Sequence, residues 1–281
     1  MTENAVESFL RSQTHPAPAV PRILAVANQK GGVGKSTTAA TLGAEAADRG
    51  LRVLLVDMDH QASLTRLLGF NPPPTSGTLY DLIEQYVSEE AVPDATQVIR
   101  PLATGEHLIA SNIKLAMADS RLQSEVSGET VIKDLLEPLT TQYDIIILDC
   151  PPTLTLLTLN ALTAATEVLI PVQPEYLAVQ GILDLQNTIA RVQRRLNKEL
   201  RVAGVLITMF RKSTSHHRER RDEITAEMKR SGIAVLGTVP DAIMIPDAAG
   251  AGQAITRLGD SEAARVYREL ADQLFGVATH G

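Results

Sequence analysis

Glycines and lysines near the N-terminal end of the sequence have a spacing that suits phosphate binding. The segment reads Lys30-Gly31-Gly32-Val33-Gly34-Lys35-Ser36-Thr37. Glycines let the backbone turn so that successive N–H groups point at phosphate oxygens, and a helix that follows adds the positive end of its dipole. Lys35 is expected to contact the β and γ phosphates, and the Ser36 hydroxyl to be a ligand of Mg²⁺. The segment from Lys30 to Thr37 is therefore predicted to bind ATP and Mg²⁺.

Carboxylates stand at the ends of two apolar segments further along the chain. Asp57 and Asp59 follow the run Val53 to Val56, and Asp149 ends the run that starts at Ile145. Ligands of α/β proteins lie beyond the carboxyl ends of the strands, where these acids would be. An apolar run that ends in aspartate is common by itself, so its meaning here depends on the glycine segment. Combined with the glycine segment, the run predicts that Asp149 reaches Mg²⁺ through water, so Ser36 and Asp149 are predicted magnesium residues.

The elements that position these residues follow one pattern, in which short apolar runs are separated by stretches of helix length. Runs without polar alternation are typical of parallel strands buried on both faces. The pattern predicts an α/β fold with a doubly wound, mostly parallel sheet and helices on both faces. The expected strands are Ile23 to Ala27, Val53 to Asp57, Leu108 to Ala110, Ile145 to Asp149, Glu167 to Val172, Val202 to Thr208 and Val235 to Val239. The expected helices are Ser36 to Arg49, Leu79 to Val87, Thr130 to Leu139, Val179 to Asn197, His217 to Ser231 and Ser261 to Phe275.

Composition limits the organisation and the class of protein. Residues 1–21 combine prolines with Ser, Thr and Gln and lack an apolar period, which predicts a flexible arm before a P-loop domain over residues 22–281. The single cysteine, Cys150, excludes a disulfide framework or a thiolate cluster within one chain. No run approaches the roughly 18 apolar residues that a membrane span needs, so a cytoplasmic protein without membrane contact is expected.

Lys30 is a second lysine that an ordinary phosphate loop does not need. The run from Lys30 to Ser36 resembles the deviant Walker A box of the ParA/MinD superfamily. Asp57-Met58-Asp59-His60-Gln61, with His60 where the family usually has proline, and Asp149-Cys150-Pro151-Pro152 are similar to further motifs of its ParA branch. The resemblance implies that Lys30 crosses a dimer interface to the partner's nucleotide, that Asp59 orients the attacking water and that Asp57 supports the metal's water shell. The catalytic residues it implies are Lys30, Lys35 and Asp59, and it adds Asp57 and Asp59 to the predicted magnesium residues.

The same resemblance implies a function and a set of partners. It implies an ATPase of chromosome or plasmid partitioning that forms an ATP-sandwich homodimer, coats double-stranded DNA nonspecifically and is stimulated by a ParB-type centromere-binding protein. Such a protein would be associated with the nucleoid in the cytoplasm. By analogy with the family, Met209, Pro240 and Asp241 are expected to hold the adenine.

A basic segment is the candidate DNA surface. Residues 191–230 contain twelve Lys and Arg against five Asp and Glu, although the whole chain carries a formal charge of −7. Flexible basic side chains on one face can bind duplex DNA without reading its sequence. The alternative interpretation of this segment is an ordinary solvated helix face. Aromatic content of 3% leaves little material for stacking on bases. The predicted DNA-binding residues are Arg191, Arg194, Arg195, Arg211, Lys212, Arg218, Arg220 and Arg221.

Departures from the family pattern leave other functions open. Asp241, Met244 and Ser213 stand where relatives carry arginine, so the DNA surface is expected to have moved toward Arg211, Lys212 and residues 218–221. A MinD-like membrane ATPase would need a basic amphipathic C-terminal helix, which residues 271–277 do not provide. A ParA-like ATPase that positions protein cargo and a nucleotide-binding scaffold without useful turnover remain as alternatives.

Overall fold

The computed structural model describes residues 21–71, 77–89, 92–241 and 254–276. Within them the strands form one eight-stranded sheet in the order β3-β4-β2-β5-β1-β6-β7-β8. All neighbouring pairs are parallel except β3 and β4, which are antiparallel at one edge. The strands are β1 (Arg22–Val26), β2 (Val53–Asp57), β3 (Ile99–Pro101), β4 (His107–Ile109), β5 (Ile145–Asp149), β6 (Glu167–Val172), β7 (Arg201–Phe210) and β8 (Val235–Pro240).

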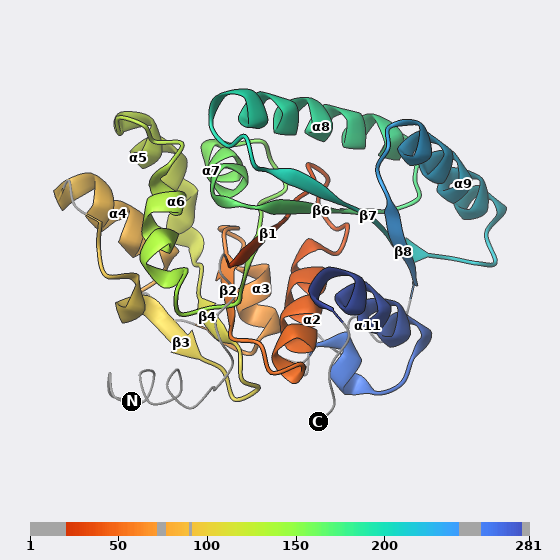
Figure 1. The fold of residues 1–281 in the computed structure, drawn as a ribbon, viewed down its shortest axis with the longest axis horizontal. Helices are drawn as coiled ribbons and strands as arrows, with labels where there is room; N and C mark the ends of the chain where they lie inside the picture. The colour runs from red at the N-terminus through yellow and green to blue at the C-terminus, as the bar shows by residue number, and fades with distance from the viewer. Residues whose placement is uncertain (1–20, 72–76, 90–91, 242–253, 277–281) are drawn as a thin grey trace.

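Helices cover both faces of this sheet (Figure 1). One face carries α4 (Leu79–Glu89), α5 (Ala118–Ser124), α6 (Val131–Leu136), α7 (Leu156–Ala164), α8 (Ala178–Arg195) and α9 (Ser215–Arg230). The other carries α2 (Lys35–Asp48), α3 (Ser63–Leu67) and α11 (Glu262–Phe275). Short 3₁₀ helices are η1 (Ala95–Val98), η2 (Ile113–Met117), η3 (Glu137–Leu139) and η4 (Ile255–Leu258).

The central strands are apolar throughout because each of their faces packs into a separate core. In β1, Ile23 and Ala25 belong to the core under α4 to α9, whereas Leu24 and Val26 belong to the core under α2 and α11. A strand that is buried on both sides has no polar alternation, and this is the physical origin of the runs seen in the sequence. The predicted doubly wound, mostly parallel α/β fold is confirmed.

Among the α-helices and strands that the structure describes, three helices and one strand were not predicted from the sequence. The helix α7 is apolar on nearly all sides, so it has no helical period to detect. Two other helices, α3 and α5, have only 5 and 7 residues, and β3 has 3 residues and ends in Pro101. The predicted arm lies outside the described residues apart from Pro21, as do most of the proline-rich residues 71–78.

Candidate nucleotide-binding site

The glycine loop lies between β1 and α2 at the carboxyl edge of the sheet. Gly32 and Gly34 have φ angles of 73° and 83°, in the left-handed region that glycine adopts without a steric penalty. Gly34 occupies the N-cap position, so α2 begins at Lys35. Because β1 lies between β5 and β6, the loop stands where the sheet order reverses, which is where ligands of open α/β sheets bind.

Side chains from distant segments hold this loop in place. The Thr208 hydroxyl donates to the carbonyl oxygen of Val33 at 2.9 Å, and Gln173 Nε2 donates to that of Gly32 at 2.9 Å. At the start of the loop, Asn28 Nδ2 donates to the carbonyl oxygen of Pro171 at 2.6 Å. The bonds from Thr208 and Gln173 use carbonyl oxygens of the loop and so do not occupy its amides, although the Lys30 amide donates to Asn28 Oδ1 at 2.9 Å.

A cavity of about 290 Å³ opens in front of the loop. Met209 on its wall has a left-handed φ of 52°, a conformation that a non-glycine residue keeps only when its surroundings impose it. Pro240 and Asp241, predicted with Met209 to hold adenine, are not among the lining residues. The cavity is lined by Gly31, Gly32, Gly34, Lys35, Ser36, Thr37, Asp59, Ser63, Leu67, Pro152 and Met209.

Lys35 and Asp149 are buried charged groups at this site, of which Lys35 lines the cavity. Lys35 is buried, and its Nζ donates to the carbonyl oxygen of Lys30 at 3.1 Å. Burial lowers the pKa of Lys35, while the charge of Asp149 opposes that shift. Asp149 is 0% exposed, and neither of its carboxylate oxygens meets hydrogen-bond geometry with a described residue, although the nearby Ser36 hydroxyl acts to lower its pKa. Burial, and then the charge of Asp57, raise the pKa of Asp149 well above its usual value. An added cation would satisfy this carboxylate.

Asp57 and Asp59 have different surroundings. Asp57 pairs in register with Asp149 and is fully buried, and its Oδ2 accepts hydrogen bonds from Thr65 N at 2.8 Å and Thr65 Oγ1 at 2.6 Å. Burial raises the pKa of Asp57 to about 6, although the bonds from Thr65 act against it. Asp59 instead lines the cavity, held by the Gln61 amide, which donates to its Oδ1 at 2.9 Å. Asp57 therefore orders the loop that presents Asp59.

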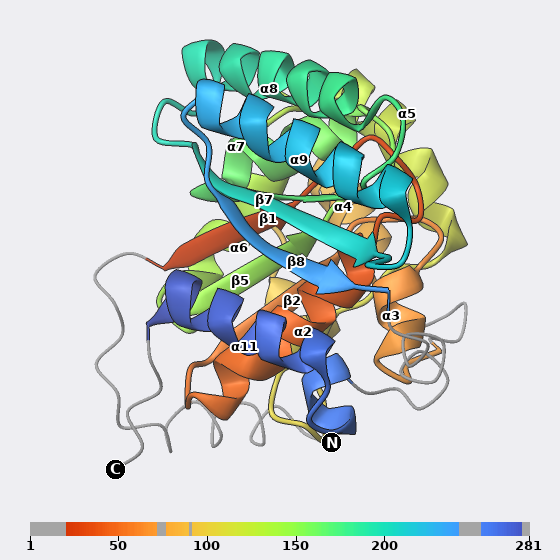
Figure 2. The ribbon, with the colours of Figure 1, turned by 90° about the vertical axis from the view of Figure 1, so that its right-hand side faces the viewer.

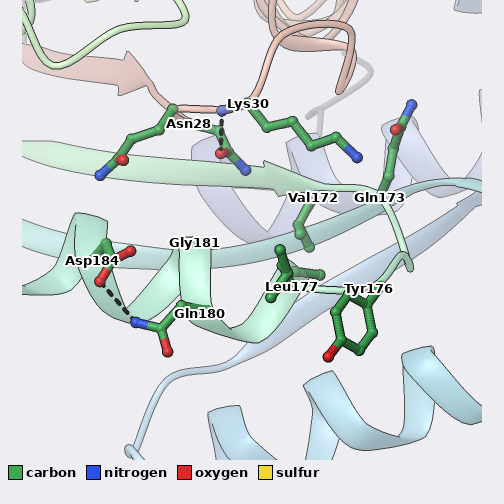
Figure 3. A pocket seen from close by; sticks show the side chains of 11 residues that line it. Asn28, Lys30, Val172, Gln173, Tyr176, Leu177, Gln180, Gly181 and Asp184 are labelled. Atoms are coloured by element: carbon green, nitrogen blue, oxygen red, sulfur yellow. Dashed lines mark hydrogen bonds between the residues drawn. The ribbon is translucent and has the colours of Figure 1, made fainter.

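Lys30 and Lys35 line different cavities. Lys30 does not line the nucleotide cavity but a neighbouring groove of about 360 Å³ between the end of β6 and the start of α8 (Figure 3). There its Nζ forms an ion pair with the Glu175 carboxylate. Within one chain, then, Lys30 does not reach the nucleotide cavity.

The predicted DNA-binding residues divide into two groups. The helices α8 and α9 lie side by side and run in the same direction, because each returns from a strand parallel to the other (Figure 2). Arg191, Arg194 and Arg195 lie in the C-terminal part of the 18-residue helix α8, about 20 to 26 Å along its axis from its first residue. The other predicted residues lie before α9 or in its first two turns, at the edge of the sheet that carries the phosphate loop.

Acidic neighbours accompany most of the second group. Arg211 pairs with Asp241 at 2.5 Å, Arg220 with Glu223 at 2.5 Å and Arg221 with Asp222 at 2.7 Å. Lys212 pairs with Glu262, while Arg218 Nη1 donates to the Lys212 carbonyl oxygen at 2.6 Å. Each of these pairs reduces the positive charge that the surface offers to phosphate.

Several residues of the site could not be found from the sequence. Gln173 and Thr208 hold the phosphate loop from 141 and 175 positions away, and Glu175 pairs with Lys30. Ser63, Leu67 and Pro152 line the cavity.

A buried strand, a glycine turn and a helix that begins at Lys35 define a P-loop nucleotide-binding protein. Comparison with known sequences narrows this class. The AAA domain family model matches residues 21–202. Sporulation initiation inhibitor protein Soj of Bacillus subtilis is 38% identical over 257 residues, which cover 90% of this chain and 98% of Soj. Chromosome partitioning protein ParA of Myxococcus xanthus is 37% identical over 238 residues, covering 84% and 81% of the two chains.

Solved structures agree with this placement. The structure described as cobyrinic acid a,c-diamide synthase from Mycobacterium smegmatis with bound ATP analog and magnesium has a TM-score of 0.77 and 36% identity, covering 91% of this chain and 94% of that one. The septum site-determining protein MinD of Pyrococcus horikoshii shares the fold at a TM-score of 0.73 and 20% identity, over 92% and 98% of the two chains. The chain therefore belongs to the AAA domain family, as a ParA/Soj-type ATPase of the ParA/MinD superfamily.

Proposed function

We propose that this protein is an ATP-dependent switch for chromosome or plasmid partitioning. Mg-ATP drives sandwich dimerisation and nonspecific binding to duplex DNA, and hydrolysis, stimulated by a ParB-type centromere-binding partner, releases the DNA. The observation that carries the proposal is the pair of loop lysines, of which Lys35 lines the chain's own nucleotide cavity and Lys30 lines the neighbouring groove. Similarity to Soj and ParA over most of the chain supports the partitioning role.

The residues present fit a magnesium ion and a triphosphate. Asp149 is a buried carboxylate whose oxygens meet hydrogen-bond geometry with no described residue, and the Ser36 hydroxyl lines the cavity beside it. Magnesium ligands are oxygens of this kind. When bound, the ion would neutralise phosphate charge and polarise the phosphate oxygens. Ser36 and Asp149 would hold it, with Asp57 and Asp59 as the proposed partners of its water shell.

The chain's own residues then have distinct roles in hydrolysis. Lys35 and the amides of the loop bind and orient the phosphates. Asp59, which lies on the cavity wall, orients the attacking water and accepts its hydrogen bond. Lys30 of one protomer contacts the nucleotide of its partner, so turnover depends on dimerisation and is slow for the protein alone.

Apolar side chains on the face around the phosphate loop support dimerisation there. Tyr176 and Leu177, which precede α8, are 74% and 67% exposed. On the other side of the loop, Leu154 after β5 and Ile113 and Met117 in η2 are 40%, 71% and 50% exposed. All five follow carboxyl ends of strands, so they surround the site and offer apolar area for a second copy to bury.

The membrane alternative has little support in the described residues. The helix α11 buries its apolar face on α2 and the sheet through Ala263, Tyr267, Leu270 and Leu274, so that face is not available to a bilayer. Among the helices that the structure describes, none combines the length and apolarity needed to cross a membrane. Positioning of protein cargo stays as an alternative, because it would use the same nucleotide site.

Sedimentation velocity with and without ATP, repeated with duplex DNA, tests the proposal. The wild-type chain is expected to be monomeric without ATP, to dimerise with it and to bind duplex only in the dimeric state. Lys35→Ala is expected to lose nucleotide binding, whereas Lys30→Ala should bind ATP and remain monomeric. Dimers that form without duplex affinity would favour protein cargo. A Lys30→Ala variant that dimerises like the wild type would refute the role of this lysine.

A further inference from the structure

Glu175 is the partner that Lys30 has within its own chain. The Lys30 ammonium and the Glu175 carboxylate form an ion pair in which both side chains are 48% exposed. The groove that holds Lys30 is lined by Gln173, Tyr176 and Leu177 of the same loop (Figure 3). The Lys30 side chain thus lies along the loop between β6 and α8 and outside the cavity in front of the phosphate loop.

The position of Glu175 is set by contacts that do not involve Lys30. Gln173 ties its loop to the phosphate loop through the Gly32 carbonyl oxygen at 2.9 Å. The Glu175 carbonyl oxygen accepts the Ala178 amide at 3.1 Å, and Leu177 turns into α8 with a left-handed φ of 69°. Because these bonds fix the loop backbone, Glu175 is held beside Lys30 before any partner arrives.

We infer that Glu175 is a positioning residue that retains Lys30 in the monomer, so that ATP-dependent dimerisation requires this ion pair to open. The inference rests on the proposed role of Lys30 across the dimer interface. A lysine paired in its own chain cannot contact a second chain's phosphates at the same time. The pair therefore competes with dimerisation and raises the protein and ATP concentrations at which the sandwich forms.

The size of the effect follows from the exposure of the pair. Ion pairs between half-exposed groups change an equilibrium by roughly 1.4- to 5.4-fold each. A symmetric dimer opens two of them, so removing the carboxylate should tighten dimerisation by the square of that factor, about 2- to 30-fold. Salt screens such pairs, so the gain should shrink as ionic strength rises.

Asp184 provides a matched control. It lines the same groove as Lys30, and its Oδ1 accepts a hydrogen bond from Gln180 at 2.8 Å. Asp184→Asn removes the same charge from the same groove as Glu175→Gln but leaves the Lys30–Glu175 pair intact. A general electrostatic effect would appear in both variants, whereas the proposed effect appears only in Glu175→Gln.

The experiment measures the dimer dissociation constant by sedimentation velocity with magnesium and a nonhydrolysable ATP analogue, at low and high salt. Glu175→Gln is expected to tighten the low-salt dimer about 2- to 30-fold, and Asp184→Asn to leave it unchanged. In the Lys30→Ala background, which is expected to remain monomeric, Glu175→Gln should not restore dimers. Dimers that reappear in the double variant would show that Glu175 acts without Lys30 and would overturn the inference. Circular dichroism verifies that each variant is folded.

A second measurement separates failure of this inference from failure of the proposed function. Acylation of lysine amines in the nucleotide-free monomer, followed by mass spectrometry, should show Lys30 more reactive in Glu175→Gln than in the wild type or Asp184→Asn. A wild type that never dimerises with the ATP analogue overturns the proposed function and the gating together. Suppose instead that the wild type dimerises and that Lys30→Ala weakens the dimer. If Glu175→Gln then fails to tighten the dimer, only the role of Glu175 is overturned.

Discussion

Asp59 and His60 show how one substitution is accommodated beside the site. His60 stands where the family usually has proline, and its Nδ1 lies 3.6 Å from Asp59 Oδ1. The carbonyl oxygen of Asp59 accepts the buried Ser111 hydroxyl at 2.7 Å, and the Asp57 Oδ1 accepts the Asp59 amide at 3.1 Å. These bonds hold Asp59 on the cavity wall, so the rigidity that proline would provide is not needed to place it.

Asp59→Ala is predicted to reduce ATP turnover by about 100-fold or more, because the carboxylate that orients the attacking water is lost. Steady-state phosphate release measures this effect. Since the nucleotide would then persist, the variant should accumulate as ATP-bound dimers in sedimentation experiments. ATP affinity within twofold of the wild-type value is the control that separates lost chemistry from lost binding. Normal turnover would show that the catalytic acid is another residue.

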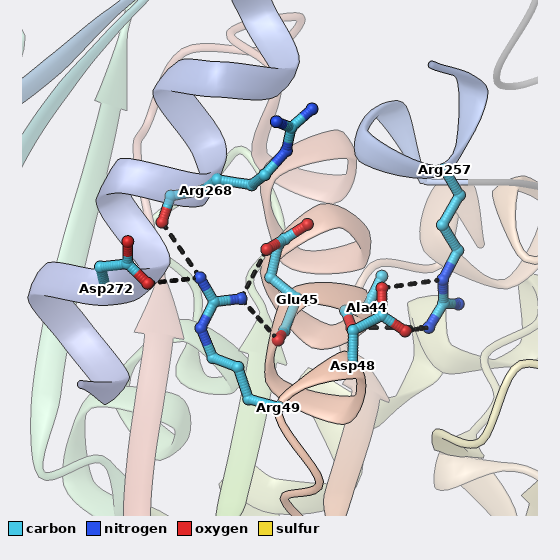
Figure 4. A network of polar contacts seen from close by, with 7 residues as sticks. All are labelled: Ala44, Glu45, Asp48, Arg49, Arg257, Arg268 and Asp272. Atoms are coloured by element: carbon cyan, nitrogen blue, oxygen red, sulfur yellow. Dashed lines mark hydrogen bonds and ion pairs between the residues drawn. The ribbon is translucent and has the colours of Figure 1, made fainter. Parts of the chain in front are cut away.

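At the level of elements, an ionic network joins the phosphate-loop helix to the C-terminal part of the fold (Figure 4). Arg49, at the end of α2, pairs with Glu45 at 2.5 Å and with Asp272 of α11 at 2.6 Å. Arg257 of η4 pairs with Asp48 at 2.7 Å. At the other end of α2 the buried Thr38 hydroxyl lies 2.9 Å from the Tyr267 hydroxyl of α11. The two helices are therefore connected along their length and should move together.

Arg257→Ala is predicted to lower the free energy of unfolding by about 3 kcal/mol. Its guanidinium pairs with Glu106 at 2.8 Å, and the Glu106 side chain is only 1% exposed, so truncation leaves a buried carboxylate without its cation. Denaturation by urea measures the loss. Arg268→Ala is the control, because its partner Asp260 is 67% exposed and such a pair contributes at most about 1 kcal/mol. Equal losses in the two variants would contradict the prediction.

For the whole molecule, the arrangement of charge decides how duplex DNA could be bound. The arginines at the start of α9 share the sheet edge of the phosphate loop, whereas those at the end of α8 lie at the opposite end of the helix layer. A flat DNA-binding surface on one face of the dimer could therefore use the arginines at the start of α9 without those at the end of α8. Dimerisation at the phosphate-loop edge would bring two copies of the first group closer together.

Reversing the charges of Arg218 and Arg221 to Glu is predicted to weaken duplex binding and to lower the slope of log affinity against log salt by about 2, since two phosphate contacts would be lost. Fluorescence anisotropy at several salt concentrations measures both quantities. The same reversal at Arg194 and Arg195 is the matched control and should leave the slope nearly unchanged. A larger loss in the control would place the DNA surface at the end of α8.

The fold class and the chemistry of the site could be predicted from local sequence. The phosphate loop depends on glycines and Lys35 within eight consecutive residues, and Asp57 and Asp149 each follow a buried apolar run. Because parallel strands end at one edge of the sheet, such runs bring their acids together without further information. Helices with an amphipathic period were also predictable, while α7, which is apolar on nearly all sides, was not.

Only the tertiary structure decided which way the side chains of the site face. The sequence places Lys30 and Lys35 five positions apart, but packing sends one into the cavity and the other to Glu175, 145 positions away. Likewise, the basic residues of segment 191–230 form two separate groups, one at the end of α8 and one at the start of α9. The two groups are apart because the start and the end of a helix that crosses the sheet lie at opposite ends of the strands. These outcomes depend on contacts between residues far apart in the chain, and such contacts leave no periodic signal in a single sequence.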